Sequence, residues 1–417
     1  MRSNAARGTL TPMLPRLDQA PITAQITLPE TGEPDLLALP AGPGVLILEP
    51  RGAEGTLLIA TTANLRELAR RRLCPDPEQP TGGQIDYRAL TGRVLGIGVG
   101  SGLEADAVYL RQARERLPAS YRAVSERWQA WFVYADPDAA FPQPARSNLR
   151  PGAGSRRGTS GTDVALPPPP GIVVGPLPDK DAAGRLIEAL IDGFDLCRFH
   201  NLLVQTPRAT ACAYKEMGRC PAPCDGTEPL ADYRARTRAA LDALTSGVLP
   251  GQLDDCRARM RAAAEAAQFE LAGELKARAD RLANLVKPAF AHIARLDRWR
   301  VLWILPGAEP GLVRPALLNS GELLRLNDQP AADPAAAARG IAQQLAGVPR
   351  EALNLTQDRL DTMGLASRWL FKPAKKRSGV ALSASAMDPS LAEIARAVRS
   401  VAAGKAGPEI DALQVEA

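Results

Sequence analysis

The chain is poor in aromatic side chains and in histidine. Phe, Trp and Tyr make up 4% of its 417 residues, and His200 and His292 are its two histidines. Single-strand-binding surfaces rely on aromatic rings that stack on bases, so a site of this class is poorly supplied. Neither histidine has a Ser or Cys partner in a recognisable motif, which argues against a hydrolytic triad.

Nucleotide-binding loops and membrane-spanning runs are also missing. The sequence contains no GxxxxGK[ST] motif, and its Gly-rich stretch at 96–102 lacks the spacing of a dinucleotide fingerprint, so we expect no bound nucleotide. Its apolar runs stay well below the roughly 18 residues that a membrane helix needs. The N-terminus has basic residues but no apolar signal-peptide core. We therefore expect a cytoplasmic protein that does not contact membranes.

The overall composition is that of a globular protein with a weak basic bias. Hydrophobic residues make up 45% of the chain and charged residues 23%. The length predicts two to four domains. A net charge of +5 and a pI near 9.0 give mild support for a polyanionic partner such as DNA.

Composition shifts divide the chain into six segments and predict an α+β fold. Residues 1–36 are rich in Pro and Thr and are expected to be a disordered lead-in. Residues 37–141 form a first domain, in which β-rich runs at 45–48 and 56–60 predict a hairpin. Residues 142–170 end in four prolines and are expected to be a linker. A Cys-rich module at 171–250, a helical segment at 251–287 and a small strand-containing and helical region at 288–417 follow.

The cysteines are clustered. Cys197, Cys212, Cys220 and Cys224 account for four of the six. In a reducing compartment such a group is more often a metal or redox site than a set of disulfides. Thiolates suit both zinc and iron-sulfur clusters, but ordinary buried thiols explain the same residues with about equal weight.

Two helical stretches carry further candidate residues. A short helix after the predicted hairpin has a basic face of Arg66, Arg70, Arg71 and Arg72, which could contact DNA phosphates or form a solvated surface. The segment 253–287 has apolar residues close to a heptad pattern. This periodicity alone predicts one continuous helix.

These stretches together resemble the UvrC family of bacterial excision-repair endonuclease subunits. The similarity is carried by VVGPLP and FDL within 173–196, by CAYKEMGRCPAPCDG at 212–226 and by a UVR-like segment at 253–282. The resemblance implies that this segment is an antiparallel helical hairpin, with its turn near Gln268, that pairs with a UvrB-type helicase. The residues expected at that contact are Met260, Phe269, Glu270, Leu271 and Leu275.

The resemblance also implies a 4Fe-4S iron-sulfur cluster on four cysteines, with zinc as the alternative metal. Cys212, Cys220 and Cys224 match family positions directly. The remaining family position is Phe199 in this chain. Cys197, two residues earlier, is therefore the expected fourth ligand.

The N-terminal part resembles a GIY-YIG nuclease domain in which the catalytic positions are replaced. Leu46 and Leu58 stand at two tyrosine positions, Leu68 at an arginine position and Arg111 at the position of the metal-binding glutamate. Metal-assisted phosphodiester cleavage needs a metal ligand and a group that stabilises developing charge. The resemblance thus implies a degenerate GIY-YIG domain with no catalytic residues.

Three hypotheses follow. The first is a UvrC-like accessory protein of nucleotide-excision repair that binds DNA, a UvrB-type partner or both without cutting. The second is a divergent, metal-dependent DNA endonuclease (an excinuclease) that makes a single incision and uses Glu104 and Asp106, the nearby carboxylates. The third is a protein-protein adaptor, unrelated to DNA, that acts through its UVR segment.

Overall fold

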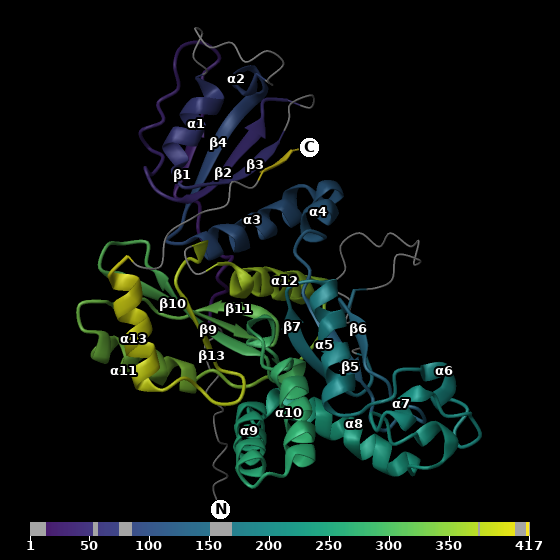
Figure 1. Ribbon diagram of the computed structural model, residues 1–417. Coiled ribbons are helices and arrows are strands. Elements are labelled where there is room, and N and C mark those ends of the chain that lie inside the picture. Colours follow the sequence, from purple (N-terminus) through teal and green to yellow (C-terminus); the bar gives the residue numbers. More distant parts are fainter. Residues whose placement is uncertain are drawn as a thin grey trace, which may run out of the picture.

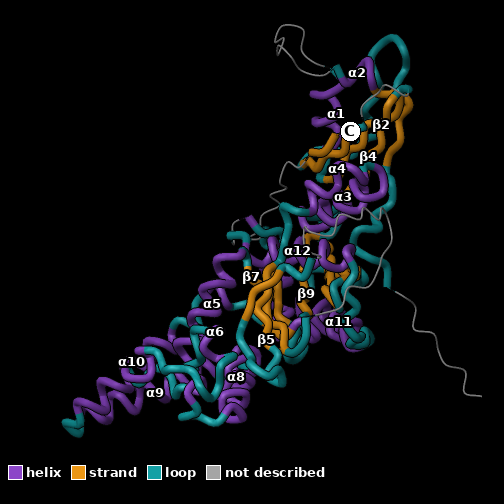
Figure 2. The backbone as a smooth tube through the Cα atoms, turned by 90° about the vertical axis from the view of Figure 1, so that its right-hand side faces the viewer, coloured by secondary structure: helices purple, strands orange, loops and turns teal. Residues whose placement is uncertain are grey.

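The computed structural model describes residues 14–52, 57–74, 86–150, 169–373 and 376–404, together with the backbone of 414–416. These residues form an α+β protein with three antiparallel sheets. The N-terminal sheet and the helical hairpin α9/α10 lie at opposite ends of the molecule (Figures 1 and 2). The C-terminal sheet and its helices lie between them.

The N-terminal sheet contains the predicted hairpin, which is confirmed as β2 (Gly44–Pro50) and β3 (Leu58–Thr62). The sheet order is β1-β4-β2-β3-β14, with β1 (Ala24–Thr27), β4 (Thr91–Gly98) and β14 (Gln414–Glu416). Strand side chains alternate between two faces. One face packs on α1 (Leu65–Leu73) and α2 (Tyr87–Leu90), and the other packs on α3 (Gly102–Arg116).

Helix α3 is buried on all sides over its first nine residues, Gly102 to Leu110. Ser101 caps its N-terminus by accepting a hydrogen bond from the Glu104 amide at 3.2 Å. The carboxylate of Glu104, 1% exposed, pairs with Arg314 at 2.6 Å. Asp106 accepts a hydrogen bond from the indole of Trp369 at 2.9 Å. The helix is thereby fixed to the C-terminal part of the chain.

The C-terminal sheet has the order β11-β10-β9-β13, and β12 pairs with β10. Its strands are β9 (Arg300–Pro306), β10 (Leu312–Asn319), β11 (Glu322–Arg325), β12 (Gln329–Pro330) and β13 (Val380–Ser383). One face packs on α11 (Pro334–Ala346) and α13 (Leu391–Ala402). The other shares one apolar core with α12 (Gln357–Phe371) and α3.

A third sheet connects the first domain to the Cys-rich module. Its order is β6-β5-β7-β8, with β6 (Ala145–Ser147), β5 (Trp131–Ala135), β7 (Ile172–Leu177) and β8 (Ala294–Arg295). The helix α4 (Pro118–Ser125) precedes β5. The predicted linker at 142–170 is therefore wrong for its first part, because β6 pairs with β5 and Arg150 binds the buried Asp361 at 2.5 Å. Residues 151–168 lie outside the described part.

The helical lobe follows β7. It contains α5 (Lys180–Gly193), α6 (His200–Leu203), α7 (Ala213–Glu216), the 3-10 turn η1 (Pro223–Asp225) and α8 (Leu230–Thr245). The helices α9 (Leu249–Glu265) and α10 (Phe269–Ala283) form an antiparallel pair, and the 3-10 turns η2 (Pro288–Phe290) and η3 (Leu296–Arg298) lead into β9. The single helix predicted from periodicity is wrong, because Ala267 adopts φ +58° and reverses the chain.

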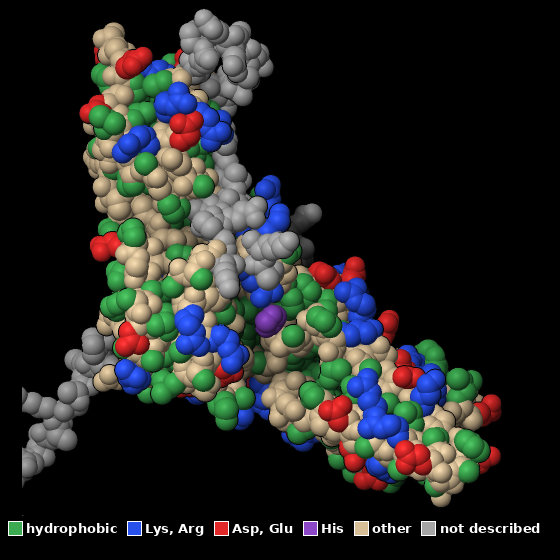
Figure 3. Space-filling model, turned by 60° about the vertical axis from the view of Figure 1, so that its left-hand side comes forward, with side chains coloured by type: hydrophobic (Ala, Val, Ile, Leu, Met, Phe, Trp, Pro, Cys, Tyr) green, Lys and Arg blue, Asp and Glu red, His purple; other side chains and the backbone are tan. Residues whose placement is uncertain are grey.

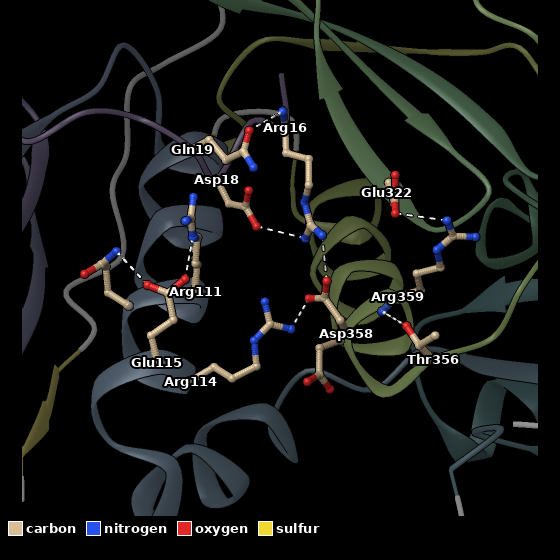
Figure 4. A network of polar contacts seen from close by, with 12 residues as sticks. Arg16, Asp18, Gln19, Arg111, Arg114, Glu115, Glu322, Thr356, Asp358 and Arg359 are labelled. Carbon is tan, nitrogen blue, oxygen red and sulfur yellow. Dashed lines mark hydrogen bonds and ion pairs between the residues drawn. The ribbon is translucent and has the colours of Figure 1, made fainter. Parts of the chain in front are cut away.

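The predicted disordered lead-in is also wrong where the structure describes it. Strand β1 pairs with β4, and the amide of Leu17 donates to the carbonyl of Leu323 at 2.8 Å. Arg16 binds Asp18 at 2.9 Å and Asp358 at 2.7 Å, and Asp358 also binds Arg114 (Figure 4). Burial opposes ionisation of Asp358, but these arginines hold its pKa below the usual value. Residues 1–13 lie outside the described part.

The ion pair between α3 and β10 gives a stability prediction. Replacing Arg314 with Ala leaves the Glu104 carboxylate buried without its main partner, which is expected to lower the free energy of unfolding by roughly 3–5 kcal/mol. Arg325→Ala is the matched control, because Arg325 is half-buried and lies 3.6 Å from Asp328. That change is expected to cost less than about 1 kcal/mol. Chemical denaturation followed by circular dichroism measures both; equal losses would contradict the assigned role.

Candidate functional site

The four clustered cysteines line one pocket in the helical lobe. Cys197 follows α5 and Cys212 precedes the first turn of α7. Cys220 lies just before the turn η1, and Cys224 lies within it. Cys197, Cys220 and Cys224 are buried, whereas Cys212 is half-buried. Residues separated by up to 27 positions are thus brought together by two short helices and a tight turn.

Phe199 stands where the UvrC resemblance leads us to expect a cysteine, but its side chain does not line the cysteine pocket. Its ring is partly exposed and packs against Tyr214, with the ring centroids 6.2 Å apart. Its backbone carbonyl accepts a hydrogen bond from the Cys197 thiol at 3.5 Å. Cys197, and not Phe199, therefore faces the pocket.

The cysteines interact with one another and with nearby cations. A hydrogen bond between the two thiol groups raises the pKa of Cys197 and lowers the pKa of Cys220 to about 6. Arg198, Lys215 and Arg219 line the same pocket. Arg198 and Arg219 both pair with Asp192, and Lys215 pairs with Asp225, so these cations already have acidic partners. Their sequence pattern is that of ordinary surface residues.

The four thiols are candidate ligands for two kinds of metal group. Within the described ranges, no group of three or more His, Cys, Asp or Glu side chains is arranged to hold one metal ion. A single zinc needs its four ligands to converge on one point at about 2.3 Å. An iron-sulfur cluster instead takes each thiolate on a different iron, so its ligands surround a volume. The four cysteines are candidate ligands for either kind of group, because thiolates bind both.

The hairpin residues expected to contact a partner fall into two groups. Phe269 and Leu271 are 73% and 42% exposed, and Glu270 between them is exposed. Leu275 is buried, and Met260 packs partly against the same apolar core. The thiol of Cys256 donates to the Leu275 carbonyl at 3.3 Å, which ties α9 to α10. The first group can therefore meet a partner, while the second stabilises the hairpin.

The four positions that the resemblance to a GIY-YIG nuclease singles out do not form a common polar site. Leu46 and Leu58 are fully buried in the apolar layer beneath α1, and Leu68 of α1 packs against that layer. Arg111 belongs to α3, on the other face of the sheet, and pairs with Glu115 at 2.7 Å. The carboxylates of Glu104 and Asp106 bind Arg314 and Trp369 inside the protein.

The basic face of α1 is largely engaged in internal contacts. Arg66 donates to the carbonyls of Leu39 and Leu37, each at 3.0 Å. Arg70 and Arg71 both pair with Glu67. The guanidinium of Arg72 lies over the ring of Tyr87, 5.1 Å from its centroid. This helix therefore presents less free positive charge than its sequence suggests.

Basic side chains are likewise mixed with acidic ones elsewhere. On the face shown in Figure 3, Lys and Arg alternate with Asp and Glu over the lobe.

None of the helices in the described segments is long and apolar enough to cross a membrane.

Comparison with known proteins places the Cys-rich module in a family. Residues 162–243 match the family described as UvrC/Cho excinuclease, middle domain. Two relatives, each named UvrABC system protein C and from two strains of Thermus thermophilus, are 34% identical over 102 residues, or 24% of this chain. The match spans 17% and 16% of the relatives' own lengths. No solved structure matches. Residues 162–243 are therefore similar to the middle domain of the UvrC/Cho excinucleases, and the chain spans less than a fifth of the length of the relatives it matches.

Proposed function

We propose that this chain is an accessory protein of nucleotide-excision repair that binds DNA, a UvrB-type partner or both, and does not cut DNA. The observation that carries the proposal is the middle-domain match over 162–243, which contains the four-cysteine pocket and leads directly into the hairpin α9/α10. The hairpin exposes Phe269 and Leu271, as a docking element would. We propose that it is a UVR motif.

Loss of nuclease activity is part of the same proposal. Leu46, Leu58 and Leu68 can neither bind a metal ion nor stabilise a phosphate, and Arg111 carries the wrong charge for a metal ligand. The alternative of a divergent endonuclease would need Glu104 and Asp106. Both carboxylates are buried and hydrogen-bonded inside the protein, which argues against that alternative.

The pocket is proposed to hold an iron-sulfur cluster on Cys197, Cys212, Cys220 and Cys224. Such a cluster would supply four metal-thiolate bonds and a redox-active centre. The thiols themselves supply the ligands, and Arg198, Lys215 and Arg219 offset the negative charge that four thiolates bring. Zinc remains the alternative metal.

Anaerobic purification tests the proposed cluster. The protein is expected to be brown, with visible absorption and roughly four irons per chain. Cys212→Ser should remove most of the iron, since it deletes one ligand. Cys74→Ser is the control, because Cys74 lies at the end of α1, outside the pocket, and should leave the iron unchanged. Stoichiometric zinc without iron, or iron that survives Cys212→Ser, would refute the cluster.

A binding measurement tests the hairpin. Phe269→Ala is expected to weaken binding to a purified UvrB-type helicase by at least about tenfold, the effect of losing an exposed aromatic anchor. Stability should change by less than about 0.5 kcal/mol, because the ring is 73% exposed. Met217→Ala, at an exposed apolar residue of the Cys-rich module, is the control. Unchanged affinity in Phe269→Ala would exclude this surface.

The salt dependence of DNA affinity distinguishes the adaptor hypothesis from DNA binding. Phosphate contacts weaken as salt rises, because binding releases counterions from DNA. Titration of duplex DNA at increasing salt should therefore show a steep loss of affinity if the chain acts on DNA. Weak DNA binding that does not depend on salt, together with tight binding to the helicase, would instead favour a protein-protein adaptor.

A further inference from the structure

The last turn of α12 and the loop after it carry a cluster of basic side chains, outside the region that matches the family. Residues 362–387 contain no Asp or Glu, whereas their basic residues are Arg368, Lys372, Lys375, Lys376 and Arg377. Lys375 lies outside the described residues. The partial negative charge at a helix C-terminus favours cations, which accounts for Arg368 and Lys372. The cations beyond the helix need another explanation.

Two of these cations rest on buried aromatic rings. The guanidinium of Arg368 lies over the ring of Trp128, 5.4 Å from its centroid, and the ammonium of Lys372 lies 3.4 Å from the centroid of the Trp369 ring. Both indoles are buried, while the two basic residues are half-buried and reach the surface. Contacts of this kind restrict long side chains, so less entropy is lost when a ligand orders them.

The loop after α12 is anchored at two points. The Nε of Arg377 donates to the carbonyl of Lys372 at 2.6 Å. The hydroxyl of Ser378 accepts a hydrogen bond from the Gly102 amide at 2.9 Å, which joins the loop to the start of α3. The basic side chains of the loop are therefore presented from a fixed backbone beside α3 and α12.

Arg377 is a half-buried cation that forms no ion pair in the part of the chain that the structure describes. Burial lowers the pKa of its guanidinium. Burial and the charge of Arg377 also lower the pKa of the nearby His292. A charge that is partly removed from water without a counterion costs free energy, which a bound anion would offset. The neighbouring Lys376 is exposed, so an anion can approach this position from solvent.

Carboxylates on the elements packed beneath this cluster already have partners. Asp106 of α3 is buried and accepts a hydrogen bond from the indole of Trp369 at 2.9 Å. Asp361 of α12 is buried and binds Arg150 at 2.5 Å. These two groups are therefore directed into the protein and do not face a ligand at the surface.

The cluster adjoins the segment that leaves the hairpin α9/α10. The ring of His292, just after the turn η2, packs edge-on against Phe371 at the end of α12, with 5.4 Å between the ring centroids. A strand bound to the cluster would therefore lie near the base of the hairpin that we propose as the docking element for a helicase.

We propose that this basic surface, formed by Arg368, Lys372, Lys376 and Arg377, binds the phosphate backbone of DNA. Backbone contacts need cations spaced along a surface and no deep pocket. Arg368 and Lys372 are neighbours one helical turn apart, and the two loop residues continue beyond them. The inference rests on the proposed function and deepens it, because it names the surface that meets DNA.

Fluorescence anisotropy of a labelled DNA duplex, titrated with the full chain over a range of salt concentrations, tests this surface. The double variant Lys376→Gln/Arg377→Gln should weaken binding by at least about tenfold at low salt and reduce the slope of log affinity against log salt by about two. Arg70→Gln/Arg71→Gln on α1 is the matched control, because it removes the same charge from residues that both pair with Glu67. The control should change affinity by less than about twofold.

The outcomes separate this surface from the proposed function. Unchanged affinity in Lys376→Gln/Arg377→Gln, or an equal loss in the control, overturns the surface while DNA binding itself stands. If the unaltered chain shows no salt-dependent binding, the surface fails together with the DNA-binding part of the proposed function. Loss of helicase binding with DNA affinity unchanged would assign the surface to an acidic protein and overturn the proposal.

Thermal melts show whether each variant is folded. Lys376→Gln alone keeps the test valid if Arg377→Gln prevents folding, because the Lys376 side chain is exposed. The single variant should weaken DNA binding by about threefold and reduce the salt slope by about one. Unchanged affinity and slope in this folded variant would count against the surface as well.

Discussion

The burial of α3 on all sides is the constraint on which the arrangement of this protein depends. One side of the helix packs on the N-terminal sheet, and the opposite side meets the C-terminal sheet and α12. Two of its buried residues are carboxylates, so the helix is stable in this position only because Arg314 and Trp369 supply partners from the C-terminal region. Two regions more than 200 residues apart in sequence therefore share a single core.

The burial of α3 limits which of its carboxylates could bind a metal ion. A nuclease helix must present a carboxylate to a metal ion and to water, whereas α3 directs Glu104 and Asp106 into the protein and pairs its exposed Glu115 with Arg111. The apolar layer on the other face of the sheet excludes metal ligands as well. The features that packing does not explain lie elsewhere, in the cysteine pocket and at the exposed end of the hairpin. The inherited functions that we propose are located at these two places.

Elements that depend on residues close together in the sequence were predicted well. Elements that depend on contacts between distant residues were not. The β2/β3 hairpin depends on residues a few positions apart, and it is confirmed. Strand β1 lacks a clear pattern of its own and forms because it pairs with β4, about 70 residues later. The reversal at Ala267 has no Gly or Pro to mark it, and apolar spacing continues through it, so periodicity missed the turn. The cysteines were found from their clustering, but only the fold brings Cys197 to the pocket and turns Phe199 away.

We propose that the chain has kept a UvrC-like middle domain without the ability to cut DNA. An incision assay tests it most directly: purified protein, incubated with nicked or damaged duplex DNA and Mg²⁺ or Mn²⁺, with and without a UvrB-type helicase. We expect intact strands under every condition, because Leu46, Leu58, Leu68 and Arg111 offer no metal ligand at the nuclease-like positions. Metal-dependent incision that co-purifies with the protein and is lost on chelation would contradict it.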